Sequence, residues 1–120
     1  MRCLIVDDSK VIRAVTRKIM EELSFETVEA ADGAEAIDRC KEQMPDAILL
    51  DWNMPRVDGL EFLGMLRQMD GGQTPIVVFC TSENAIDKID SALKSGANEY
   101  IMKPFDSEII QSKLQQVGLI

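Results

Sequence analysis

Residues 4–8 are Leu-Ile-Val-Asp-Asp, an apolar run that ends in two acids, and the same pattern recurs along the chain. Residues 47–51 end a second apolar run in an aspartate, residues 75–81 end a third in a threonine, and residues 99–103 end a shorter fourth in a lysine. Buried strands of a parallel sheet are continuous apolar runs of this kind, and ligands bind beyond their carboxyl ends. The sequence therefore predicts that three carboxylates, a hydroxyl and an ammonium group meet on one rim of a sheet.

Helical patterns separate these runs, so strands and helices alternate along the chain. Five strands alternating with five helices predict an α/β fold with right-handed crossovers. The expected form is the flavodoxin-like doubly wound (βα)5 fold, with a five-stranded parallel sheet of order 2-1-3-4-5. Strands are expected near residues 2–6, 26–30, 46–50, 76–80 and 99–102. Helices are expected near residues 10–23, 34–43, 60–69 and 84–94 and after residue 107.

Periodic apolar residues give several helices a face toward the sheet. Ser9 and Ser107 are expected to cap the first and last helices, because a serine hydroxyl can accept a backbone N–H at a helix start. The residues expected to face inward are Ile12, Val15, Ile19 and Leu23 in the first helix, Ile86, Ile89 and Leu93 in the fourth, and Ile110, Leu114 and Val117 in the last.

The composition fits one globular domain. The chain has 120 residues, 46% of them hydrophobic, which predicts a single domain with its own core over residues 1–120. No apolar stretch is long enough to span a membrane, and the first strand begins too early to leave room for a signal peptide. Cys3, Cys40 and Cys80 lie in apolar contexts and are expected to be buried and reduced, so we expect a soluble cytoplasmic protein.

Two further features of the composition narrow the function. The chain carries 13 basic and 21 acidic residues, a net charge of −8, so nucleic acid is not an expected partner. It contains no histidine, so it can neither phosphorylate itself on histidine nor bind zinc through imidazole. A phosphoryl group at the predicted rim would have to come from another molecule.

The predicted rim suits a metal-assisted phosphoryl transfer. Where the strand order reverses, Asp7 and Asp8 should lie beside Asp51, and three close carboxylates repel one another unless a cation lies among them. A single aspartate at a strand end is often a turn former, but this set favours a site for Mg²⁺, with Mn²⁺ as a substitute. Asp51 is the expected phosphoryl acceptor, and Lys103 and the Thr81 hydroxyl are expected to bind the phosphoryl oxygens.

These residues resemble the receiver domains of two-component response regulators. The motifs are Asp7-Asp8, residues 51–55 (Asp-Trp-Asn-Met-Pro), Thr81-Ser82 and residues 103–105 (Lys-Pro-Phe). The likeness covers essentially the whole chain and is strongest to the free-standing chemotaxis regulators.

The resemblance implies a reaction and a set of ligands. A histidine kinase would phosphorylate Asp51, and Mg²⁺ would be held by Asp7, Asp8, Asp51 and the backbone carbonyl of Asn53. The peptide bond between Lys103 and Pro104 would be cis.

The resemblance also implies a switch. Thr81 would move toward the phosphoryl group and Tyr100 would turn inward, which changes the surface of the fourth helix, fifth strand and last helix. That surface would bind a target protein such as a flagellar motor switch component, through Ile89, Tyr100 and Lys113. Without the resemblance, Tyr100 would be interpreted as an ordinary half-buried aromatic residue of a strand.

Two further positions are expected to tune dephosphorylation. By resemblance, Asn53 and Glu83 flank the phosphoryl group and steer the water that hydrolyses it, and a phosphatase is a further expected partner. Glu83 could equally be an acid favoured by the first turn of a helix. The basic residues of the first helix would either dock the phosphodonor, as the resemblance implies, or form a solvated face; they are Lys10, Arg13, Arg17 and Lys18.

The expected function is a signalling switch rather than an enzyme, with its own phosphorylation and slow dephosphorylation as its only catalysis. Chemotaxis or flagellar motor control is the expected setting. Within the family, the alternatives are a phosphate shuttle or sink in a relay, or the receiver part of a longer transcriptional regulator. In other classes, a flavin-binding protein is disfavoured because Asp7 and Asp8 would repel the flavin phosphate, and a small-molecule phosphatase would need a deeper pocket.

Overall fold

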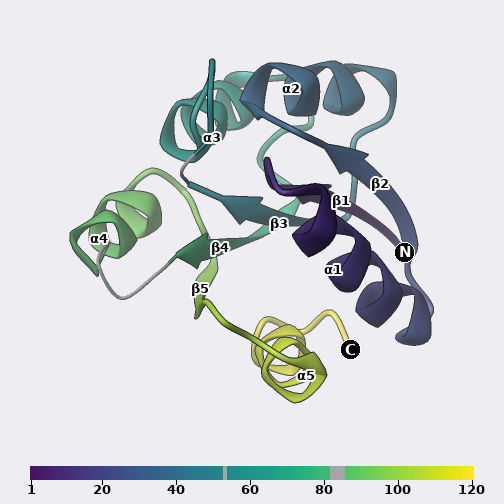
Figure 1. Ribbon diagram of the computed structural model, residues 1–120. Helices are drawn as coiled ribbons and strands as arrows, with labels where there is room; N and C mark the ends of the chain where they lie inside the picture. The colour runs from purple at the N-terminus through teal and green to yellow at the C-terminus, as the bar shows by residue number, and fades with distance from the viewer. Residues whose placement is uncertain (53, 82–85) are drawn as a thin grey trace.

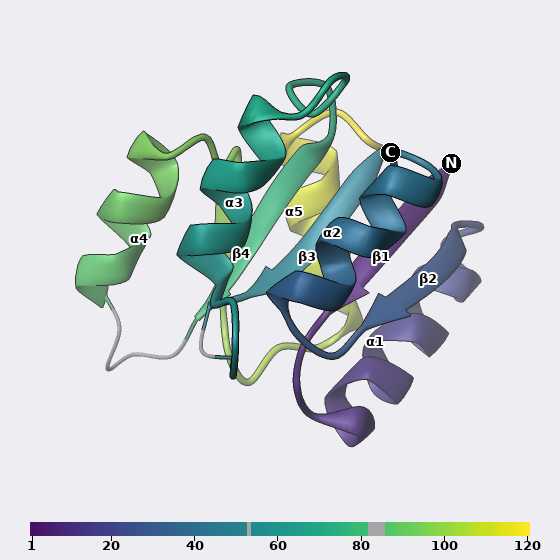
Figure 2. The same ribbon diagram turned by 90° about the horizontal axis from the view of Figure 1, so that it is seen from above.

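The computed structural model describes residues 1–52, 54–81 and 86–120. Its centre is a five-stranded parallel sheet of order β2-β1-β3-β4-β5, with helices on both faces (Figure 1 and Figure 2), so the predicted fold and strand order are confirmed. The strands are β1 (Arg2–Val6), β2 (Glu26–Ala30), β3 (Ala47–Asp51), β4 (Ile76–Thr81) and β5 (Glu99–Met102). The helices are α1 (Lys10–Glu22), α2 (Gly33–Glu42), α3 (Gly59–Gln68), α4 (Ile86–Lys94) and α5 (Ser107–Gln116).

Two apolar clusters, one on each face of the sheet, form the core. Helices α2, α3 and α4 cover one face of the sheet (Figure 1). Phe62 and Phe79 are fully buried on that face. Helices α1 and α5 cover the other face, where Met20, Ile110 and Leu114 pack against the strands. Successive strand residues point to opposite faces, so burial on both faces explains why the central strands β1, β3 and β4 are mostly apolar, whereas the edge strand β2 carries Glu26 and Glu29.

The parallel register brings the carboxyl ends of the strands to one edge. Asp51 pairs with Cys80, and Thr81 pairs with Met102. Both β3 and β4 therefore extend one residue further than predicted, and Asp51 and Thr81 belong to strands. At the other end, β3 begins one residue later than predicted, after Asp46, whose carboxylate accepts the backbone N–H of Arg2 at 2.8 Å.

The predicted cap of α1 is confirmed and that of α5 is wrong. The Ser9 hydroxyl accepts the backbone N–H of Ile12 at 3.3 Å. In α5, however, Asp106 is the N-cap, because its carboxylate accepts the N–H of Ile109 at 2.9 Å, and Ser107 is the first helical residue. Aspartate and serine are comparable caps, so two adjacent candidates left the start of this helix ambiguous by one residue.

Two predicted inward positions are also wrong. Val15 is 51% exposed and Leu93 is 42% exposed, while the neighbouring Thr16 and Ala92 are buried. Each helical residue turns the chain by about 100°, so an error of one position moves a side chain off the buried face. The other inward residues in the described part are buried or partly buried; they are Ile12, Ile19, Leu23, Ile89, Ile110, Leu114 and Val117.

The start predicted for the fourth helix, at residue 84, lies outside the described residues, as does the side chain of Ile86. The three cysteines are buried, as expected. Across the described ranges, none of the helices has the length and apolar character needed to cross a membrane.

Candidate functional site

Three carboxylates meet at the carboxyl edge of the sheet. Asp51 ends β3, and Asp7 and Asp8 directly follow β1, the neighbouring strand. One oxygen from each of the three lies within 4.8 Å of the other two. Asp7 and Asp51 are each 5% exposed, whereas Asp8 is open to solvent. The structure thus brings together the three acids that the strand ends indicated, and we call this set the acidic rim.

Lys103 brings a positive charge to the acidic rim from just beyond β5. Its Nζ lies 2.9 Å from Asp7 Oδ2 and 3.1 Å from Asp51 Oδ1. Burial alone would lower the pKa of Lys103, but the hydrogen bond to Asp7 and the charges of Asp51 and Asp7 outweigh burial and raise that pKa. The ammonium group is therefore firmly charged. The peptide bond between Lys103 and Pro104 is cis, as the resemblance implied.

Asp51 is an ionisable group in a poorly solvated place. Burial raises the pKa of Asp51 to about 6, the charge of Lys103 opposes this rise, and the charges of Asp7 and Asp8 add to it. At neutral pH, above that value, most of the carboxyl group is ionised. An electron-rich oxygen is thus held at the edge of the sheet in a largely buried position.

The ligand set of the acidic rim fits a divalent cation of the Mg²⁺ type. Three carboxylates and one ammonium leave the rim with two negative charges, which a divalent cation would balance. Mg²⁺ prefers hard oxygen ligands and keeps several of its waters. The exposure of Asp8 leaves this edge open to water. Asp7, Asp8 and Asp51 are the described residues that could hold the ion.

Thr81 lies at the same edge, on the strand beside β3. Its neighbour Cys80 is paired with Asp51, so Thr81 stands one residue beyond the acceptor candidate in the register. Thr81 is buried, and its backbone carbonyl accepts the N–H of Lys103 at 2.7 Å. The hydroxyl-bearing and ammonium-bearing residues are therefore joined through their backbones at the rim.

The residues predicted for a partner surface lie on α4, β5 and α5. Tyr100 is partly buried against the core, and Lys113 Nζ lies 4.8 Å from the centroid of its ring. Lys113 also lies 3.4 Å from Glu99 Oε1. Ile89 is half-buried on α4. The structure thus places Tyr100 and Lys113 in contact with each other, on β5 and α5.

Asn53 and Glu83 lie outside the described residues. Their expected roles, as a carbonyl ligand and as residues that tune dephosphorylation, stay predictions.

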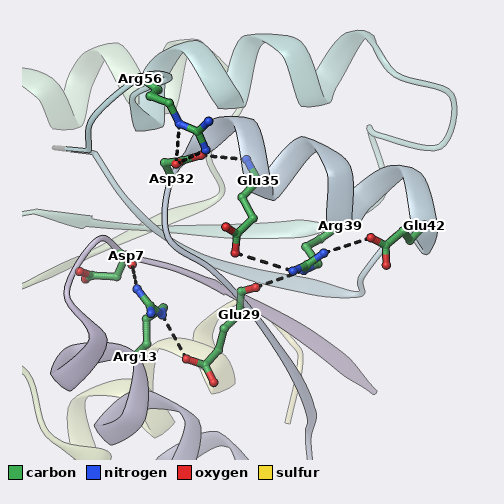
Figure 3. A network of polar contacts seen from close by, with 8 residues as sticks. All are labelled: Asp7, Arg13, Glu29, Asp32, Glu35, Arg39, Glu42 and Arg56. Carbon is green, nitrogen blue, oxygen red and sulfur yellow. Dashed lines mark hydrogen bonds and ion pairs between the residues drawn. The ribbon is translucent and has the colours of Figure 1, made fainter.

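Two contacts near the rim were not predicted from the sequence. Arg56, in the loop after β3, donates hydrogen bonds to the carboxylate of Asp32, the N-cap of α2 (Figure 3). On α4, Lys88 Nζ lies 5.3 Å from the centroid of the Trp52 ring, beside Asp51. Both contacts join different elements through long side chains, and no spacing along the sequence reveals such pairs.

The fold and the rim define a class: a doubly wound α/β domain with an acidic, lysine-containing site at the carboxyl edge of its sheet. The family model described as response regulator receiver domain matches residues 3–115, so the chain belongs to the response regulator receiver domain family. It is 37% identical over 115 residues to the chemotaxis protein CheY of Halobacterium salinarum, an alignment that covers 95% of this chain and 93% of that protein. It is 33% identical over 119 residues to the chemotaxis protein CheY1 of Helicobacter pylori, covering 98% of this chain and 96% of that protein.

Solved structures support the same assignment. The chemotaxis response regulator CheY4 of Vibrio cholerae superposes with a TM-score of 0.90 and 31% sequence identity, covering 97% of each chain. The receiver domain of NtrX from Brucella abortus superposes with a TM-score of 0.87 and 27% identity, covering 95% of each chain. The chain is thus a CheY-like receiver domain of a two-component system.

Proposed function

We propose that this chain, one domain over residues 1–120, is a phosphorylation-activated switch whose acceptor is Asp51. The observation that carries the proposal is the Lys103 ammonium group, within hydrogen-bonding distance of both Asp7 and Asp51. An ammonium group between two carboxylates supplies positive charge where the oxygens of an incoming phosphoryl group would lie. Phosphoryl transfer depends chiefly on such positioning and charge neutralisation.

The chain has no histidine of its own to carry the phosphoryl group, so the group comes from another molecule, and membership of the receiver domain family supports a histidine kinase as the donor. The setting is the cytoplasm. A carboxylate oxygen of Asp51 attacks the phosphorus atom. The P–N bond to the donor imidazole breaks, and the imidazole leaves with the electron pair and takes up a proton. The product is an aspartyl phosphate, whose new negative charges face Lys103 and the hydroxyl of Thr81.

The acidic rim would hold Mg²⁺, or Mn²⁺ in its place, through Asp7, Asp8, Asp51 and the backbone carbonyl of Asn53. When bound, the ion neutralises charge on the phosphoryl oxygens. Hydrolysis of the aspartyl phosphate, with the water steered by Asn53 and Glu83, returns Asp51 to its carboxylate. A separate phosphatase would shorten the signal further.

Phosphorylation at the rim changes the conformation of the surface formed by α4, β5 and α5. Thr81 moves toward the phosphoryl group, and Tyr100 turns into the space beside it, so that this surface favours a target protein in the phosphorylated state. Ile89, Tyr100 and Lys113 are the proposed contacts. The names of the relatives support a role in chemotaxis. A flagellar motor switch component is the proposed target.

Receiver domains of this shape also occur within longer proteins, which supports a second candidate. A structure of NtrX from Brucella abortus matches 98% of this chain but only 26% of its own length, with a TM-score of 0.88 and 27% identity. A receiver within a longer regulator, or a shuttle or sink in a relay, would use Asp51 in the same way. A shuttle or sink would not need the surface of α4, β5 and α5 to change.

Backbone amide NMR of the full chain tests the switch. Mg²⁺ alone should move amide signals at the acidic rim, and Mg²⁺ with acetyl phosphate should also move signals of α4, β5 and α5. The Asp51→Asn variant should show no second set of changes. Changes confined to the rim would favour the shuttle or sink, and equal changes in Asp51→Asn would contradict the proposed acceptor.

A further inference from the structure

We propose that Arg13 is a positioning residue that fixes Asp8 at the acidic rim by holding the backbone carbonyl of Asp7. The inference rests on the proposed function, in which Asp7 and Asp8 are ligands of Mg²⁺. It extends that function to a residue of α1 that lies outside the acidic cluster.

Arg13 lies near the start of α1 and reaches Asp7 and Glu29 rather than solvent (Figure 3). Its side chain is 16% exposed; Nη1 donates to the carbonyl oxygen of Asp7 at 2.8 Å, and Nε donates to Glu29 Oε1 at 3.1 Å. Glu29 belongs to β2, so one guanidinium joins α1, β2 and the loop that follows β1. The planar guanidinium has donors in fixed directions and can hold two acceptors at once.

Asp8 depends on this contact more than Asp7 does. The Asp7 carboxylate is held by its own hydrogen bonds, from the N–H of Ser9 at 2.9 Å and from Lys103 at 2.9 Å. Within the described ranges, no hydrogen bond holds the Asp8 carboxylate, so the backbone that leads to it sets its position. The peptide between Asp7 and Asp8 is planar and includes the Cα atom of Asp8. Fixing the direction of its carbonyl therefore fixes the orientation of the peptide plane and the position of that Cα atom.

Arg17, one turn further along α1, provides a comparison within the same helix. Its Nη1 lies 3.1 Å from Glu29 Oε2, its Nε lies 3.9 Å from Glu21 Oε1, and its side chain is 49% exposed. Both arginines therefore pair with Glu29, but among the described contacts only Arg13 reaches Asp7. Loss of either arginine removes a cation from Glu29, whereas only loss of Arg13 releases the carbonyl.

Charge and positioning predict opposite effects on metal binding. As a nearby cation, Arg13 repels a divalent ion, so its removal would tighten Mg²⁺ binding if charge alone mattered. As a positioning residue, Arg13 keeps Asp8 in place, so its removal weakens Mg²⁺ binding. Groups that orient metal ligands typically change affinity by about 10–100-fold.

Calorimetric titration of the full chain with Mg²⁺ tests the inference, with wild type, Arg13→Met, Arg13→Lys and Arg17→Met compared. We expect Arg13→Met to weaken binding about 10-fold, in the range for groups that orient ligands. Arg13→Lys should weaken binding less, because a lysine can reach one of the two acceptors but not hold both. Arg17→Met should stay within about twofold of wild type, as for an exposed ion pair. Unchanged or tighter binding by Arg13→Met, or equal weakening in both methionine variants, would overturn the inference.

Urea unfolding without metal separates positioning from a general loss of structure. Both methionine variants lose an ion pair to Glu29, and Arg13→Met also loses the hydrogen bond to the Asp7 carbonyl, so its unfolding midpoint should fall further while the variant stays folded without urea. If Arg13→Met does not fold, Arg13→Lys carries the comparison, and wild-type affinity in that variant would overturn the inference. A wild-type chain that binds no Mg²⁺ would overturn the proposed function itself. If the wild type binds Mg²⁺ and the Arg13 variants bind it with the same affinity, only this inference is overturned.

Discussion

At the scale of single residues, two of the three carboxylates of the acidic rim, Asp7 and Asp51, are buried and compete for the same partners. Lys103 contacts one oxygen of Asp7 and one of Asp51, and both carboxylates are largely withdrawn from water. A proton on Asp51, the Lys103 ammonium group and a bound cation would all neutralise the same oxygens. The residue that balances the rim without metal is therefore also the residue that opposes metal binding.

Replacing Lys103 should separate its stabilisation of the metal-free rim from its opposition to metal binding. Lys103→Met should bind Mg²⁺ several-fold more tightly, because a competing cation is gone. The metal-free variant should be less stable by about 1–3 kcal/mol, since Asp7 and Asp51 lose their charged partner. Calorimetry and urea unfolding measure the two changes. Lys113→Met, which removes a lysine paired with Glu99 away from the rim, serves as the control. Weaker Mg²⁺ binding by Lys103→Met than by this control would contradict the assignment.

Asp32 makes stability depend on pH. Burial alone would raise the pKa of Asp32, but the backbone N–H of Glu35 and the hydrogen bond and charge of Arg56 outweigh burial and lower that pKa. Because the folded pKa lies below the unfolded value of about 3.9, the carboxylate stabilises the fold above that pH. The contribution disappears as the pH falls through the folded pKa.

The variant Asp32→Asn tests this dependence, since asparagine keeps the helix cap and removes the charge. Urea unfolding at a series of pH values should find the variant less stable than wild type at neutral pH. The difference should shrink as the pH falls below about 4, where the unfolded carboxylate takes up its proton, and disappear below the folded pKa of Asp32, where the folded carboxylate is also protonated. A difference that does not change with pH would show that the charge on Asp32 is not the cause.

At the scale of elements, short polar side chains decide where helices begin. Ser9, Asp32, Asp58 and Asp106 accept backbone N–H groups at the starts of α1, α2, α3 and α5. Three of these helices follow strands whose ends form or adjoin the rim. The caps therefore set the lengths of the loops that carry the functional residues.

The two candidate caps of α5 can be compared directly. Asp106→Ala should lower the free energy of unfolding by about 1 kcal/mol, because an N–H at the helix start loses its acceptor. Ser107→Ala should change it by less than about 0.5 kcal/mol, as for an ordinary exposed position. Chemical denaturation of both variants measures the difference. The reverse order of the two effects would restore Ser107 as the cap.

At the scale of the whole molecule, the strand order determined which residues of the site could be predicted from the sequence to lie together. Asp7, Asp8 and Asp51 could be placed together because parallel strands end at one edge and β1 lies beside β3 in the strand order. Lys103 could be placed at the same edge, although its contacts with Asp7 and Asp51 depend on its long side chain. The contacts of Arg13 with Asp7 and of Arg56 with Asp32 could not be predicted from the sequence, because long side chains can take many conformations and reach across elements. The predicted inward positions of Val15 and Leu93 were wrong because each helix packs on the sheet through a neighbouring face, although the helical spacing of its apolar residues is right.

The central claim is that Asp51 is the phosphoryl acceptor. Its most direct test is the intact mass of the full chain after incubation with Mg²⁺ and acetyl phosphate. Asp106→Asn serves as a control for the loss of an unrelated carboxylate. Wild type and Asp106→Asn should each gain the mass of one phosphoryl group and lose it again by hydrolysis, while Asp51→Asn should gain none. An adduct of equal extent on Asp51→Asn would place the acceptor elsewhere and contradict the account.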